Sequence, residues 1–266
     1  MSSSTSIPNV TQLFHAAHED GDLSGPSLQA LQVQADIGQQ IQAGLGVAPD
    51  DVRSSQVVLV TMMPDDSGSI RFQGNAQLVR DGHNLVLDAL ARSAQRDDVL
   101  VHTRYLNGEV LYPYRNVDGA PRMTSQNYDP NQGTPLYDQI AVLLGTVLVK
   151  TRELEDAGIP VRSVSLILTD GADEHSTRQK PHTLRPLVED MLRKETHIVA
   201  AMGISDGSTD FRRVFRDIGI PDAWILTPGN TATEIRRAFQ TFSQSAVRAS
   251  QSAGSFSKTA LGGFGN

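Results

Sequence analysis

The sequence predicts a three-layer α/β/α fold, in which helices cover both faces of a mostly parallel sheet. Apolar runs of strand length alternate along the chain with segments whose apolar residues recur every three or four positions. This alternation is typical of parallel sheets covered by helices. The clearest strand is the run Val-Val-Leu-Val-Thr-Met-Met at 57–63. It has no polar alternation, which indicates a central strand buried on both faces.

The first half of the domain follows from this strand. Pro64 ends it, because proline has no N–H to donate to the sheet. An antiparallel hairpin at the sheet edge is expected from two β-like runs at 98–105 and 109–114, which Asn107-Gly108 separates as a tight turn. The polar residues at 116–133 predict a loop. A helix is expected at about 73–95, where one face carries Ala76, Val79, Val86, Leu87, Leu90 and Ala94.

The second half repeats the alternation. Pro135 opens a helix that runs to about Ala157, because a proline in the first turn loses no hydrogen bond there. Gly158 and Pro160 end that helix. A capping box from Thr231 to Glu234 opens the last helix, expected over 231–247. The remaining elements are strands at 164–168, 197–202 and 223–226 and helices at 184–195 and 211–218.

Two extensions flank this domain, which is expected to span 55–247. Residues 1–54 contain one predicted helix at about 27–45, too short to be a domain of its own. The composition of 248–266 is mainly Ser, Gln, Ala and Gly and predicts a disordered tail. Its hydrophobic residues can be read as anchors for a partner or as ordinary exposed side chains; they are Phe256, Leu261 and Phe264.

Composition excludes several classes of protein. The formal net charge of −7 argues against a nucleic-acid surface, which needs a basic face. The chain has no cysteine, which excludes disulfides and thiolate metal sites, and its 7 histidines lack zinc-ligand spacing. The amino terminus lacks the pattern of a secretory signal, and no apolar run is long enough to span a membrane. A cytoplasmic protein is therefore expected.

Three polar segments follow predicted strands or open a predicted helix. Asp65-Asp66-Ser67-Gly68-Ser69 comes after the strand at 57–63, Thr134 precedes the helix that Pro135 opens, and Asp170 follows the strand at 164–168. In an open α/β sheet, ligands bind beyond the carboxyl ends of the strands. Carboxylate and hydroxyl oxygens are the ligands that hard divalent cations prefer. Asp65, Ser67, Ser69, Thr134 and Asp170 are therefore candidate metal ligands.

The ordered set Asp-x-Ser-x-Ser, Gly-Thr-Pro-Leu and Thr-Asp-Gly resembles the metal-ion-dependent adhesion site (MIDAS) of von Willebrand factor A (VWA) domains, over residues 55–247. The resemblance implies a Rossmann-like VWA fold. It also implies that Ser67 and Ser69 bind Mg²⁺ directly, and that Asp65, Thr134 and Asp170 bind it directly or through water. Mn²⁺ or Ca²⁺ would suit the same ligands.

The resemblance also implies a function. The expected protein is a non-enzymatic interaction module of the intracellular bacterial type, in which the Asp or Glu of a protein partner completes the coordination of the metal. Relatives of that type work beside AAA+ ATPases or in stress and defence complexes. Neither a nucleic acid nor a membrane is expected as a partner.

Two other functions are consistent with parts of the pattern. A Mg²⁺-dependent phosphotransferase or hydrolase would resemble Asp-x-Asp-x-Thr, whereas Ser67 holds the third position here, and there is no phosphate-binding loop. A scaffold with a purely structural metal would keep fewer hydroxyls. Taken singly, Asp65 and Asp170 also suit a helix cap and a turn. Asp66 and Asp173 receive no direct role, and Asp138 is expected to favour the first turn of its own helix.

Overall fold

The computed structural model describes residues 10–251 and 262–264. Within them, six strands form one sheet in the order β3-β2-β1-β4-β5-β6. The edge strand β3 is antiparallel to β2, and the other neighbouring strands are parallel. The fold class predicted from the sequence, a three-layer α/β/α arrangement with an antiparallel edge hairpin, is confirmed.

The strands are buried because their sequences are apolar throughout. Every residue of β1, β2 and β5 is buried. The polar Thr61 of β1 is paired inside the sheet, where its Oγ1 and the hydroxyl of Tyr114 lie 2.6 Å apart. The strands are β1 (Val57–Met63), β2 (Val99–Arg104), β3 (Val110–Asn116), β4 (Val161–Thr169), β5 (His197–Gly203) and β6 (Ile225–Leu226).

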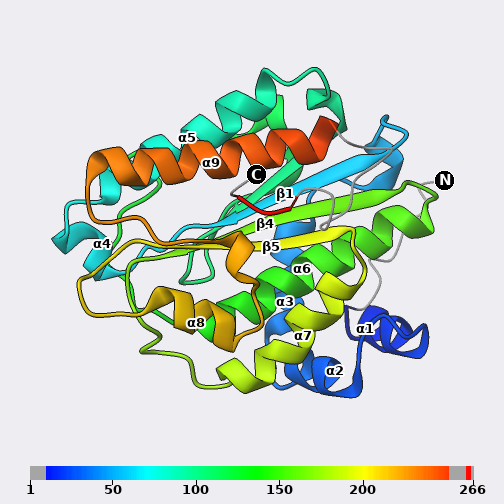
Figure 1. The fold of residues 1–266 in the computed structure, drawn as a ribbon. Helices are drawn as coiled ribbons and strands as arrows, with labels where there is room; N and C mark the ends of the chain where they lie inside the picture. The colour runs from blue at the N-terminus through cyan, green and yellow to red at the C-terminus, as the bar shows by residue number, and fades with distance from the viewer. Residues whose placement is uncertain (1–9, 252–261, 265–266) are drawn as a thin grey trace.

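Helices cover both faces of the sheet, as Figure 1 shows. The helices α5 (Ala76–Ala91) and α9 (Ala232–Gln251) lie together on one face. They approach closely at Gly82, where a Cβ atom would come within 2.1 Å of the ring of Phe239. The other face carries α1 (Val10–Glu19), α2 (Gly25–Gln32), α3 (Ile37–Leu45), α6 (Leu136–Asp156) and α7 (Pro181–Arg193). Two short helices, α4 (Gly68–Phe72) and α8 (Phe211–Asp217), lie at the end of the sheet where β1 and β5 finish.

The amino-terminal segment contains more helices than the single one expected over 27–45. That prediction is wrong, because α2 and α3 are separate helices and α1 precedes them. Leu31 and Ile41 would lie about 15 Å apart along one straight helix. Both nevertheless reach Gly145 of α6, where their methyl groups lie 3.2 and 2.8 Å from the position of a Cβ atom. The chain therefore bends between α2 and α3, and this bend lets both Leu31 and Ile41 pack on α6.

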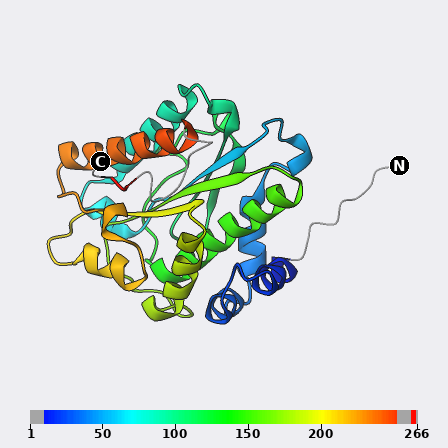
Figure 2. The same ribbon diagram turned by 45° about the vertical axis from the view of Figure 1, so that its right-hand side comes forward.

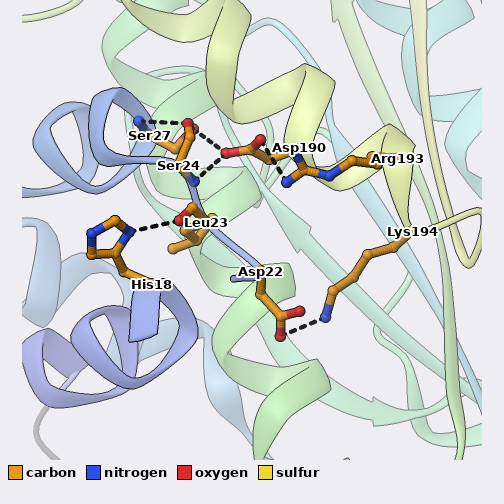
Figure 3. Close-up of polar contacts among 8 residues, drawn as sticks. All are labelled: His18, Asp22, Leu23, Ser24, Ser27, Asp190, Arg193 and Lys194. Atoms are coloured by element: carbon orange, nitrogen blue, oxygen red, sulfur yellow. Dashed lines mark hydrogen bonds and ion pairs between the residues drawn. The ribbon is translucent and has the colours of Figure 1, made fainter. Parts of the chain in front are cut away.

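The helices α2 and α7 lie side by side (Figure 2), and polar contacts between the amino-terminal segment and α7 hold them together (Figure 3). Asp190 accepts hydrogen bonds from the backbone N–H of Ser24 (2.6 Å) and from the hydroxyl of Ser27 (2.5 Å). Lys194 forms an ion pair with Asp22 (2.6 Å). These contacts join the start of α2 and the turn before it to α7 and its carboxyl-terminal cap.

The carboxyl-terminal helix α9 continues to Gln251, four residues beyond its predicted end at Val247. Its last turns are rich in small residues that pack closely. Ala249 is buried, and the hydroxyl of Ser250 lies 3.4 Å from that of Ser93, just after the carboxyl end of α5. Phe264 lies edge-on to Trp224 at 5.2 Å between ring centroids. Phe256 and Leu261 lie outside the described residues. The division of the chain at residues 54 and 247 stays a prediction.

None of the helices within 10–251 and 262–264 combines the length and the apolar character that a membrane crossing requires.

Candidate metal centre

Asp65 forms the base of the candidate metal centre, directly after β1. Its side chain is fully buried. One carboxylate oxygen accepts a hydrogen bond from the N–H of Ser67 (2.7 Å), and the other accepts one from the hydroxyl of Thr169 (2.6 Å). Burial raises the pKa of Asp65 above its ordinary value, although these hydrogen bonds oppose the rise. Asp65 thus ties the loop after β1 to the end of β4.

Two serine hydroxyls connect this base to Asp170. The Oγ atoms of Ser67 and Ser69 lie 2.8 Å apart, and Ser69 donates to the Oδ1 of Asp170 (2.5 Å). The Oδ2 of Asp170 is buried and has no hydrogen-bond partner. Burial, with the nearby charge of Asp65 as a smaller contribution, raises the pKa of Asp170 to about 7. Burying a carboxylate oxygen costs free energy of folding unless another group pairs with it.

Thr134 completes the group from the segment before α6. Its carbonyl accepts hydrogen bonds from the N–H groups of Glu174 and His175, both 3.2 Å, and its own N–H donates to the Nδ1 of His175 (2.9 Å). The loop that carries Asp170 is therefore locked to the start of α6. Thr134 itself is buried.

A cavity of about 570 Å³ opens over this group, and its lining includes Ser67, Ser69, Thr134 and Asp170. Asp65 lies beneath the lining, where its oxygens hold the loop. The structure thus brings all five predicted residues to one end of the sheet. In the part of the chain that the structure describes, no cluster of three or more histidine, cysteine or acidic residues is suited to a metal. A metal here would depend on the hydroxyls, and the donor set suits a hard cation. The assignment of the five ligands stays a prediction.

Two contributors to the centre were not predicted. Thr169 bonds Asp65, and the hydroxyl of Tyr128 donates to the backbone carbonyl of Asp65. Thr169 stands next to Asp170 in the sequence, so the Thr-Asp-Gly pattern contained a signal for it. Tyr128 comes from the loop at 116–133, and nothing in its local sequence points to this contact.

Three further acidic residues surround the centre. Asp66 is buried and accepts a hydrogen bond from the N–H of Asn107 (3.0 Å). Asp173 accepts one from the N–H of Tyr137 (3.3 Å). Asp138 lies in the first turn of α6 as expected, but it also accepts hydrogen bonds from backbone N–H groups after β4, including that of Gln179 (2.7 Å). These acids fasten the loops that carry the candidate ligands.

Comparisons with known proteins give matches in structure only. No family model and no curated protein sequence matches the chain. The pilus adhesin SpaC from Lactobacillus rhamnosus GG is 15% identical over 73% of this chain and 31% of that chain, with a TM-score of 0.52. Proximal thread matrix protein 1 from the mussel byssus is 16% identical over 72% of this chain and 46% of that chain, at 0.49. The VWA domain of SpRpn10 is 10% identical over 70% of this chain and 94% of that chain, at 0.49.

The chain therefore spans less than half the length of the adhesin and of the byssus protein. At these identities the likeness concerns the fold and carries no residue's role from one protein to another. The match to SpaC, together with the strand order, supports the three-layer α/β fold that the resemblance to VWA domains implies.

Proposed function

We propose that this chain binds Mg²⁺ through Asp65, Ser67, Ser69, Thr134 and Asp170, and that the bound ion holds the Asp or Glu of a protein partner. Mn²⁺ and Ca²⁺ suit the same oxygen ligands. The observation that carries the proposal is the Oδ2 of Asp170, which is buried beside two serine hydroxyls and has no partner in the protein. A cation would supply that partner and satisfy the hydroxyl oxygens as well.

The charge of the surroundings indicates why the partner's acidic residue needs the ion. The described residues that line the cavity include Asp170, Glu174 and Asp206 and no lysine or arginine. An acidic side chain would be repelled from such a cavity. Asp65 and Asp170 balance a divalent ion, and the hydroxyls add no charge. The ion therefore remains able to attract one further carboxylate.

The proposal describes a binding module and not an enzyme. The loop after β1 offers Ser67 where a phosphotransferase of this general fold would need a second acid. A role in the bacterial cytoplasm, within a multi-protein system such as one that contains an AAA+ ATPase or a stress or defence complex, extends the proposal. That extension rests on the resemblance to VWA domains alone.

Calorimetry with MgCl₂ and MnCl₂ tests the metal site directly. Ser67→Ala removes one hydroxyl from the lining and should weaken binding at least about tenfold. Ser208→Ala is the matched control, because Ser208 lines the same cavity but is exposed and is not among the proposed ligands. It should leave the affinity unchanged. Equal affinities for the two variants and the wild type would contradict the assignment.

Capture of partners tests the second half of the proposal. The full chain is immobilised and incubated with acidic peptides in the presence of MgCl₂, and then with EDTA. Binding should disappear with EDTA and return when MgCl₂ is restored. Binding that ignores chelation would mean that the metal is structural or that a different surface binds the partner.

A further inference from the structure

Phe72 is exposed beside the candidate metal centre. It is the last residue of α4 and is 89% exposed. Among the described residues, the only other large hydrophobic side chain that is exposed is Val33, at 47%. The neighbouring apolar residue of α4, Ile70, is fully buried. Phe72 therefore contributes no packing to the core, and its position needs another explanation.

The ring of Phe72 lies over the loop that carries the candidate ligands. A Cβ atom on Gly68 would come within 3.4 Å of the Cε2 of Phe72, so the ring lies against the backbone between Ser67 and Ser69. Phe72 also lines the same cavity as Ser67, Ser69 and Asp170. A partner side chain next to the metal would meet this ring. Large aromatic side chains supply much of the binding free energy in protein interfaces.

The negative charge around the cavity restricts which residue types can neighbour the acidic residue of the partner. Glu174 and Asp206 line the cavity with Asp170, and a second acid close to the first would be repelled by them. An apolar residue would instead bury the ring of Phe72. Residues two apart in an extended peptide lie on one side and about 6.6 Å apart, so neighbouring positions of one segment can present an acid to the metal and an apolar side chain to the ring.

We propose that Phe72 determines the specificity of this surface: the partner segment carries a single Asp or Glu with a bulky apolar residue within two positions, and the ring of Phe72 packs on that apolar residue. This inference rests on the proposed function, because it assumes that a metal ion binds the acidic residue. It adds the chemistry of the neighbouring residue and the side chain that recognises it.

Selection from a random peptide library tests both statements separately. The full chain is presented to phage-displayed 12-residue peptides in MgCl₂, and bound phage are eluted with EDTA. We expect eluted peptides to contain one acid with Leu, Ile, Met, Phe or Trp within two positions. Failure to recover any EDTA-eluted peptide would overturn the proposed function and this inference together. Recovery of acidic peptides without an apolar neighbour would overturn this inference alone.

Variants of Phe72 then test whether its ring causes the preference for an apolar residue beside the acid. Two peptides that differ only by Leu or Ser beside the acid should bind the wild type with affinities that differ about tenfold or more. Phe72→Ser should reduce that ratio to below about twofold, while Phe72→Leu retains most of it. Calorimetry without peptide should show unchanged Mg²⁺ affinity for Phe72→Ser, and its melting temperature should match the wild type because the ring is exposed.

Val33→Ser is the control, since Val33 is exposed at a separate cavity between α2 and α7. It should keep the full ratio. A Phe72→Ser variant that still prefers the leucine peptide tenfold would overturn the inference and leave the metal site standing.

Discussion

Two clusters of buried polar groups among the described residues differ in how completely they are paired. The hairpin cluster consists of His83, Thr103 and Tyr112. The Nε2 of His83 lies 3.0 Å from the hydroxyl of Thr103 and 3.1 Å from that of Tyr112, and Thr103 donates to Tyr112 (2.8 Å). The candidate metal centre instead buries the carboxylates of Asp65 and Asp170 and leaves one oxygen of Asp170 without a partner.

The difference separates a structural cluster from a binding site. The hairpin cluster is a closed network between α5, β2 and β3, in which the protein supplies its own partners. Closed networks of this kind stabilise one packing arrangement. Buried carboxylates with an unpaired oxygen are costly until a cation neutralises them. A metal ion should therefore bind at the candidate metal centre and leave the hairpin cluster unaffected.

The largest effect is expected when the unpaired oxygen is removed. Asp170→Asn keeps an oxygen that can accept from Ser69, but it removes one of the two charges that balance the ion. We expect Mg²⁺ affinity to fall on the order of a thousandfold, which is about 4 kcal/mol. Saturating MgCl₂ should raise the melting temperature of the wild type and not that of the variant, since only bound ligand stabilises the folded state.

Calorimetry and thermal melts with MgCl₂ or EDTA measure both quantities. In EDTA the variant should be at least as stable as the wild type, because a desolvated carboxylate has been replaced by a neutral amide. A variant that keeps wild-type affinity, or that unfolds more easily in EDTA, would show that Asp170 is a structural residue and would remove the contrast between the clusters.

The hairpin cluster should respond to pH. Burial, with a smaller contribution from the charge of Arg122, lowers the pKa of His83 from 6.5 to about 4. Between these values the unfolded chain binds a proton at this residue and the folded protein does not. Stability that is fully present above pH 6.5 is therefore lost as the pH falls towards 4, by at most about 1.4 kcal/mol per pH unit for this residue.

Urea denaturation of the wild type and of His83→Gln at about pH 7 and about pH 5.5 in EDTA measures this contribution. His102, His197 and the buried carboxyl groups titrate in both proteins, so their contributions cancel in the comparison. The variant should lose about 1 kcal/mol less than the wild type between the two pH values. Equal losses would mean that His83 does not titrate as a buried neutral group.

The sequence predicted which side chains lie together in the candidate metal centre better than it predicted the contacts that support them. Asp170 follows β4 directly, and Asp65 and Ser67 lie in the loop that follows β1. Local pattern was therefore enough to place them at one end of the sheet. The contact of Tyr128 with Asp65 joins residues far apart in the chain, and a loop sequence carries no signal for its tertiary partner. The bend between α2 and α3 likewise brings Leu31 and Ile41 onto Gly145, a residue far away in the sequence.

The smallest effect is expected at Asp66, which tests whether the centre contains two acids or three. Asp66 is buried next to Asp65, and burial raises its pKa to about 7. One of its oxygens is used by the N–H of Asn107, which places the carboxylate towards the hairpin turn. Asp66→Asn keeps that acceptor and removes only a nearby charge. Mg²⁺ affinity should therefore fall less than about fivefold, or about 1 kcal/mol.

Calorimetry of Asp66→Asn and Asp170→Asn under the same conditions gives the comparison. If Asp66→Asn lost as much Mg²⁺ affinity as Asp170→Asn, Asp66 would be a metal ligand. The proposed difference between Asp66, which fastens the loop, and Asp170, which binds the cation, would then be wrong.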